Sequence, residues 1–418
     1  RFREAWATST MSHNIVVVNG QEQALAENPG HQTVVAFATD NEHFQLAATE
    51  SDSAYPGITE KYRRTLMLIG NNADNSYLLD VFEVKGGYRH DYLLHGDTDH
   101  ESNLKVEGTS LRPFRGTLVN PGVTFQLPET AEDDMGKEGA FSFIQNLQIG
   151  NAREPLRLDF RLERDSTKGS RTLFAPIADA EIFTGRSPSI RPAEENDAEL
   201  DQHMRPTFVA RREGANLDSV FVAAHESIAG FPRLHDIRTR FADGRIWISV
   251  RHSGGRDYIS LVRGDNEPGS ATFNTSKGEF KTDGTYAIVR LDRNDAIVSA
   301  HLVEGNKLEF RNFNLDGSGQ FTGTIKQVFG EKAGETSFEL SERISIRNAD
   351  ALIVGFPDGS KRAFSVTHVE PSPGGTTVYV RESAGFTVEG NEILIKVPER
   401  AIEGTAITYR LIVCTNSE

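Results

Sequence analysis

Short apolar runs separated by turn residues recur along the whole chain. The runs are rich in Val, Ile, Phe and Thr, which are favoured on a pleated, half-buried surface. Pairs such as Asp243-Gly244 and Asp358-Gly359 stand between the runs and are typical of hairpin turns. The clearest expected strands are residues 14–18, 33–37, 64–69, 77–84, 245–250, 286–291, 377–380 and 392–397. Because helical periodicity is scarce and the connections look local, we expect an all-β chain with antiparallel sheets.

The length of the chain favours more than one domain. Its 418 residues exceed the roughly 250 to 300 residues at which a single core stops growing. The strand pattern is interrupted near residues 330–335 and then resumes. We therefore predict a large antiparallel β-sandwich (supersandwich) over residues 1–332, followed by a small C-terminal β-domain over residues 333–418.

Charge and composition narrow the choice of partners. The chain has 60 acidic and 45 basic residues, and this net charge of −15 disfavours binding to a nucleic acid. An acidic protein can still hold an anionic sugar in a local cluster of Arg and His. No apolar run reaches the roughly 20 residues of a membrane span, so we expect none. Cys414 is the one cysteine of the sequence, which excludes an intrachain disulfide.

The densest polar cluster lies in residues 86–96, directly after an expected strand. Its candidates for substrate binding are Arg89, His90, Tyr92 and His95. Imidazoles in such a turn could bind a carboxylated sugar or move protons. The alternative is a structural loop in which His and Asp satisfy each other, and the residues alone leave both interpretations open.

One histidine could bind a metal ion, and a pair of arginines could bind an anion. His13 stands just ahead of the run 15–18, where a histidine can bind zinc, but zinc ordinarily takes about three or four protein ligands. Because one ligand does not make a zinc site, a hydrogen-bonded structural role is favoured for His13. His31 is a possible second imidazole, although its spacing from His13 gives no support for a shared metal. Arg211 and Arg212 could bind a carboxylate or sulfate, although modest surface ion pairs are the favoured interpretation.

One block of sequence carries a resemblance to a known family. Residues 6–23, Trp-Ala-Thr-Ser-Thr-Met-Ser-His-Asn-Ile-Val-Val-Val-Asn-Gly-Gln-Glu-Gln, resemble the His-Asn-Thr-Val-Val-Val-Asp-Gly block of heparinase II/III-like polysaccharide lyases. Ile15 replaces the usual Thr of that block, and Asn19 replaces the usual Asp. Residues 62–66, 77–82, 86–96 and 212–222 continue the resemblance, which covers at least residues 6–226.

The resemblance implies an activity and a missing partner. Members of this family join an N-terminal α/α-toroid to a C-terminal antiparallel β-sandwich, and cleave uronic-acid polysaccharides by β-elimination. The present chain is similar to the second part, which implies a periplasmic or secreted protein that binds an anionic uronate polysaccharide. Most catalytic residues would come from a toroid upstream or on an associated chain, so we expect the chain alone to be inactive and assign no catalytic residue within it.

The resemblance also bears on metal binding. In family members with a structural zinc, the position matched by His13 is a ligand, and its partners would precede Arg1. It therefore implies a structural zinc in the parent protein, with His13 as a ligand. The alternative to a lyase is a non-catalytic carbohydrate-binding or scaffold module, for which exposed aromatic platforms would be the mark. Trp6 and Trp247 lie in or near strand-like runs and do not favour it.

Overall fold

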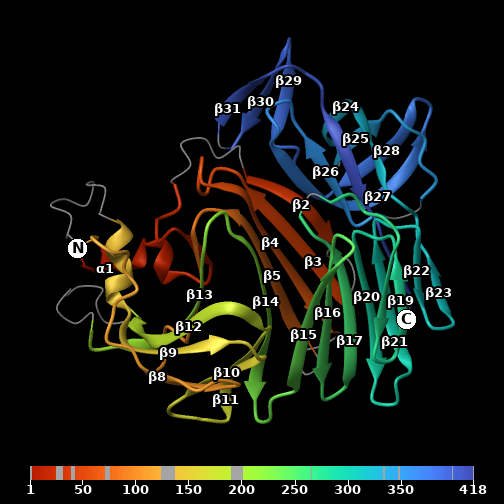
Figure 1. Cartoon of the computed structure of the whole chain (residues 1–418). Helices are drawn as coiled ribbons and strands as arrows, with labels where there is room; N and C mark the ends of the chain where they lie inside the picture. The colour runs from red at the N-terminus through yellow and green to blue at the C-terminus, as the bar shows by residue number, and fades with distance from the viewer. Residues whose placement is uncertain are drawn as a thin grey trace. The chain divides into compact units, whose positions relative to one another are not determined.

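Strands run from one end of the chain to the other (Figure 1). The computed structural model describes residues 2–24, 32–38, 43–70, 76–123, 137–189, 201–264, 266–332, 335–346, 349–397 and 399–417, which leaves His31 outside the described residues. Of the residues that the structure describes, 63% lie in strands and 3% in helices, and the strands form several antiparallel sheets. The prediction of an all-β, sandwich-type fold is confirmed.

Contacts divide the chain into two compact units, of which the first comprises Arg1–Leu25, Ala54–Tyr62 and Tyr77–Arg238. One of its sheets has the order β1-β6-β13-β12-β9-β8. These strands are β1 (Val16–Val18), β6 (Arg89–His95), β13 (Met204–Glu213), β12 (Ile177–Pro188), β9 (Gln145–Ala152) and β8 (Arg112–Pro113). The short helical elements are α1 (Phe2–Ala7), η1 (Thr10–Ser12) and η3 (Lys137–Phe143).

The same unit holds consecutive strands of another sheet, in the order β5-β14-β11-β10-β7. They are β5 (Tyr77–Gly86), β14 (Asp218–Ala229), β11 (Lys168–Phe174), β10 (Leu156–Leu162) and β7 (Ser102–Glu107). A core of buried side chains, including Phe82, Tyr92, Phe174, Phe208 and Phe221, joins the facing sides of the two sheets. The unit is therefore a sandwich, held by apolar burial and by paired aromatic rings.

The outer face of the six-stranded sheet is also covered. Trp6, Phe141, Phe143 and Phe183 belong to a second buried cluster on that side. As a result β6 is buried on both faces, and each of its seven residues is buried. Strands of this kind are ordinarily continuous apolar runs, whereas β6 reads Arg-His-Asp-Tyr-Leu-Leu-His.

The second unit comprises Ala26–Ser53, Arg63–Ser76 and Thr239–Glu418. Neighbouring strands near its start are β2 (Gln32–Ala38), β3 (Phe44–Ser51) and, from Arg63 onwards, β4 (Thr59–Ile69). A six-stranded sheet follows the order β15 (Leu234–Ala242), β16 (Arg245–His252), β17 (Gly255–Val262), β20 (Tyr286–Asp292), β21 (Ile297–Val303) and β33 (Cys414–Ser417). A four-stranded sheet contains β18 (Ala271–Thr275), β19 (Gly278–Thr282), β22 (Lys307–Phe310) and β23 (Phe313–Asp316).

The last part of the second unit is a closed barrel with a small sheet. The barrel order is β24 (Phe321–Lys332), β25 (Glu335–Leu340), β28 (Gly375–Val380), β27 (Lys361–Ser372), β26 (Ala351–Gly355) and β32 (Thr408–Ile412). The small sheet contains β29 (Phe386–Glu389), β30 (Glu392–Lys396) and β31 (Glu399–Glu403). One apolar cluster, which includes Phe338, Phe364 and Phe386, fills this part. The domain boundary predicted after residue 332 stays a prediction.

Two of the predicted hairpin turns are confirmed. Asp243 and Gly244, with φ of 52° and 68°, join the neighbouring strands β15 and β16. This pair of positive φ angles is the mark of a type I′ turn, which Asp-Gly favours. Asp358-Gly359 joins β26 and β27, which pair antiparallel. None of the helices in the described residues is long and apolar enough to cross a membrane.

Candidate functional site

The predicted site segment 86–96 is a turn followed by a central strand, so its interpretation as a loop was wrong. β6 lies between β1 and β13, whereas the preceding strand β5 belongs to another sheet. The chain changes sheets at Gly86 and Gly87, with φ of 102° and 80°. A Cβ atom on Gly86 would lie 2.4 Å from the carbonyl oxygen of Ile58, so glycine is needed there.

His90 and Tyr92 face the core between the two sheets. The His90 Nε2 atom lies 2.6 Å from the Gly86 carbonyl oxygen and Nδ1 lies 2.7 Å from Ser219 Oγ. Since a carbonyl only accepts, Nε2 carries the proton and Nδ1 accepts from the serine hydroxyl. Burial lowers the pKa of His90 to about 4, which keeps the ring neutral at pH 7. The Tyr92 hydroxyl donates to Asp80 Oδ2 at 3.2 Å.

The opposite face of β6 holds a buried charge cluster. Asp91, which is 0% exposed, accepts hydrogen bonds of 2.6 Å from Arg89 Nε and from Arg211 Nε. Both guanidinium groups also donate to the Leu118 carbonyl, at 2.6 Å and 3.1 Å. The favoured prediction of a surface ion pair was wrong for Arg211, because the fold places it beside a buried carboxylate. Arg212 does form such a pair, with Asp179 at 2.6 Å.

His95 ends the strand in an enclosed position. Its Nδ1 lies 3.0 Å from Thr207 Oγ1 and its Nε2 lies 3.0 Å from the Met11 carbonyl, while Trp6 packs edge-on at 5.9 Å. Burial lowers the pKa of His95 below its ordinary value. The structure thus brings Arg89, His90, Tyr92 and His95 onto one strand, at most 7% exposed, with hydrogen-bond partners inside the protein. Their contact with substrate stays a prediction.

An accessible polar site lies nearby, around the exposed His13 and Arg205 of β13. Arg205 Nη2 donates to the Ser12 carbonyl at 2.7 Å and Nη1 donates to Thr98 Oγ1 at 3.0 Å. Its Nε atom is buried without a hydrogen-bond partner among the described residues. Burial lowers the pKa of Arg205 to about 10, and no carboxylate of the described residues offsets this effect.

His13 completes this site as a neutral group. Partial burial, followed by the positive charge of Arg205, lowers the pKa of His13 below its ordinary value. An imidazole and a cation that lacks an acidic partner are suited to binding a carboxylate or sulfate. Sequence analysis did not single out Arg205, because nothing in its local pattern separates it from the ion-paired Arg211 and Arg212. The difference depends on which carboxylates the fold brings near.

The family resemblance implies a zinc ion bound by His13, so the residues around His13 should include further ligands. No group of three or more His, Cys, Asp or Glu among the described residues is placed to hold a metal ion. His13 has the neutral ring that a ligand needs, but the neighbouring charge of Arg205 opposes a dication. The described residues alone therefore do not form a zinc site, and a zinc completed by other ligands stays a prediction.

The comparisons with known proteins give distant structural similarity. No protein-family model matches the chain, and no curated protein matches it. The heparan sulfate lyase HepC from Pedobacter heparinus matches with a TM-score of 0.37 and 11% identity over 62% of this chain and 32% of that chain. A crystal structure of heparinase III matches with a TM-score of 0.37 and 10% identity, over 62% and 30%. The match spans about a third of the length of these lyases and transfers no activity or site residue.

Proposed function

We propose that the chain is the β-part of a periplasmic or secreted lyase that cleaves uronic-acid polysaccharides by β-elimination. An N-terminal α/α-toroid, on the same parent chain or an associated one, supplies the main catalytic residues. The observation that carries the proposal is the half-buried Arg205, a cation without an acidic partner among the described residues, beside the accessible His13. His13 is also the histidine of the block that carries the family resemblance, so two independent features meet at one place.

The chemistry of β-elimination explains what such a site contributes. A base removes the proton α to the uronate carboxylate, a carbon–carbon double bond forms, and the departing sugar oxygen takes a proton. Negative charge grows on the carboxylate during proton removal, so a fixed cation at that group lowers the barrier. Arg205 binds the carboxylate through N–H groups at the edge of its guanidinium, and the neutral His13 ring forms a hydrogen bond to the sugar.

The test measures binding of uronate oligosaccharides, since catalysis also needs the toroid. Arg205→Ala is expected to weaken the affinity for a hyaluronan or heparan sulfate oligosaccharide about tenfold in calorimetry, because it removes a charge-assisted contact. Arg205→Lys should keep part of the affinity, since it keeps the positive charge but loses the planar pair of N–H donors of the guanidinium group. Arg212→Ala is the matched control, because it removes the same charge from the same strand and should have little effect. Equal affinity of the Arg205→Ala variant and the unmodified chain would refute the site.

A non-catalytic carbohydrate-binding module is the alternative function. Such modules use exposed flat rings as platforms for sugars. Trp6 and Trp247 are 1% and 2% exposed, so neither tryptophan supports this alternative. Tight binding of neutral glycans that is unaffected by salt would favour the module over the lyase.

A further inference from the structure

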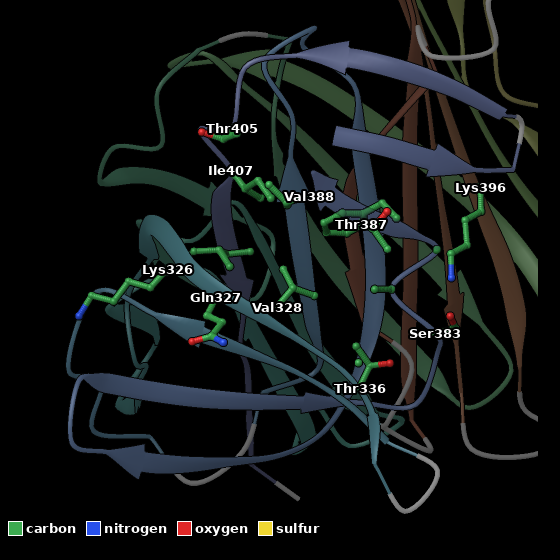
Figure 2. A pocket seen from close by; sticks show the side chains of 15 residues that line it. Lys326, Gln327, Val328, Thr336, Ser383, Thr387, Val388, Lys396, Thr405 and Ile407 are labelled. Carbon is green, nitrogen blue, oxygen red and sulfur yellow. The ribbon is translucent and has the colours of Figure 1, made fainter. Parts of the chain in front are cut away.

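A polar cavity of about 590 Å³ lies between β24 of the C-terminal barrel and the segment 383–388, remote in sequence from Arg205. Figure 2 shows Lys326 and Lys396 on opposite sides of it. β24 forms one wall, the segment 383–388 forms another, and Thr405 and Ile407 precede β32 at the third side. This volume falls within the range of about 300 to 1,000 Å³ that is typical of small-molecule sites.

The charges around the cavity are positive and incompletely neutralised. Lys396 is an exposed residue of the cavity lining, and none of the ion pairs found among the described residues includes it. Arg362 lies directly behind Gly385, where a Cβ atom would come within 2.4 Å of its Nη1. The guanidinium of Arg362 donates to the carbonyls of Gly385 and Val397, at 3.4 Å and 2.6 Å, and has no acidic partner in the described part of the chain. Lys326 is partly offset, because its charge stabilises the Glu342 carboxylate.

The remaining lining matches the two kinds of surface on a sugar. Short polar side chains that can bond to sugar hydroxyls are Gln327, Thr336, Ser383, Thr387 and Thr405. Apolar side chains that can pack against the C–H face of a ring are Ile325, Val328, Phe386, Val388 and Ile407. A neutral sugar would use the hydroxyl contacts alone, whereas an acidic sugar would also pair with the ammonium group of Lys396, which lines the cavity. Arg362 does not line the cavity, and its positive charge acts only from behind Gly385.

We propose that this cavity is a second, non-catalytic site, and that it binds a short segment of an acidic, uronate- or sulfate-bearing oligosaccharide. The choice of a sugar as ligand rests on the proposed function, while the choice of an anion rests on Lys396 in the lining, with the positive charge of Arg362 behind it. For a polymer long enough to reach both sites, a second site raises the effective concentration of the polymer at the first site, so such a polymer is bound more tightly than by either site alone.

The experiment isolates the second site in the Arg205→Ala background. Calorimetry measures binding of a heparin-derived hexasaccharide, a hyaluronan hexasaccharide and the neutral maltohexaose. Lys396→Ala is expected to weaken the remaining binding of the two acidic sugars about fivefold, and Lys396→Glu more than tenfold, because a charge pair is removed or reversed. Thr387→Trp, which places a large ring in the cavity, should abolish that binding. Lys281→Ala, an exposed lysine of β19 paired with Glu309, is the charge-matched control.

The outcomes separate this site from the proposed function. If Arg205→Ala removes all binding while Lys396→Glu binds like the unmodified chain, the second site is overturned and the proposed function stands. If Lys396→Glu and Thr387→Trp remove binding while Arg205→Ala has no effect, the second site stands and the proposed function falls. Equal affinity for maltohexaose and the acidic sugars would overturn the requirement for an anion.

Discussion

Asp91 has no exposed surface, yet it lies between the guanidinium groups of Arg89 and Arg211. The sequence pattern could predict that residues 86–96 are unusual, because a strand with so many polar residues must satisfy them internally. It could not predict the partners, since Arg211 and Leu118 are remote in sequence from Asp91. The residues of β6 were therefore identified correctly as a polar group, while their burial depended on the packing of Phe141 and its neighbours.

Removing the Asp91 carboxylate should destabilise the protein strongly. Asp91→Ala leaves two buried cations side by side, and breaking a buried ion pair in this way costs roughly 3 to 5 kcal/mol. Urea unfolding followed by circular dichroism measures the loss of free energy. Asp179→Ala removes the same charge from the exposed ion pair with Arg212 and should cost less than about 1 kcal/mol. Similar losses in the two variants would contradict the role assigned to Asp91.

Because His301 in β21 is buried, we expect the stability of the fold to fall at acidic pH. The side chain is 1% exposed, its ring packs at a tilt against Phe44 with 5.4 Å between the ring centroids, and its ring nitrogens have no hydrogen-bond partner among the described residues. Burial, with smaller effects from the charges of Arg290 and His43 and an opposing effect of Asp257, lowers the pKa of His301 to about 4. The unfolded chain has the ordinary pKa of about 6.5, so between these values it binds more protons than the folded chain.

Stability should therefore be fully present above pH 6.5 and should fall as the pH drops towards 4. The contribution of His301 to this loss is about 2 kcal/mol between pH 7 and pH 5, from the difference between the two pKa values. His301→Phe keeps a flat ring and removes the titration, so its unfolding free energy should depend less on pH than that of the unmodified chain. Urea unfolding at pH 7, 6 and 5 provides the measurement, and parallel pH profiles would show that His301 stays hydrated or paired.

At the scale of elements, the positions of strands could be predicted from the sequence, whereas the sheet to which each strand belongs could not. The runs 77–84 and 245–250 became β5 and β16, because alternation and β-branched residues act locally. The sheet to which a strand belongs depends on contacts distant in sequence. β5 and β6 follow each other in the chain but lie in different sheets. The turn between them was expected from its glycines, whereas the change of sheet at that turn was not.

Gly86 makes that change of sheet possible, so replacing it should be costly. Gly86→Ala combines a φ of 102° with a Cβ atom 2.4 Å from the Ile58 backbone oxygen, and roughly 3 kcal/mol or more of stability should be lost. Gly57→Ala is the control, because Gly57 has a φ of 71° with no atom within 4 Å of the added Cβ. The control should lose about 1 to 2 kcal/mol from backbone strain alone. Equal urea midpoints for the two variants would show that Gly86 tolerates the contact by a backbone shift.

At the scale of the whole molecule, the net charge of −15 makes any binding of an acidic polymer depend on local cations. The sequence allowed such a cluster but did not locate it. Arg205 and Lys396 are the candidates because the fold leaves them without acidic partners in the described residues, whereas Arg89, Arg211 and Arg212 are paired with carboxylates. The polar side chains therefore divide into a buried set on β6, with hydrogen-bond partners inside the protein, and a more accessible set, His13, Arg205 and Lys396, which we propose as anion-binding residues.

This division predicts that the chain alone produces no unsaturated sugar. The neutral rings of His90 and His95 are 0% and 7% exposed and are held by hydrogen bonds to Gly86 and Met11, so neither reaches the proton α to a polymer carboxylate. Uronate polysaccharide incubated with the chain should bind without an increase in the ultraviolet absorbance of the elimination product. Adding a toroid protein that restores activity should make the rate depend on Arg205, with Arg205→Ala slower and the Arg212→Ala control unchanged. Product formed by the chain alone would contradict the proposal that the toroid supplies the main catalytic residues. It would require a base among the accessible residues of this chain, and His13→Ala would be the first variant to measure.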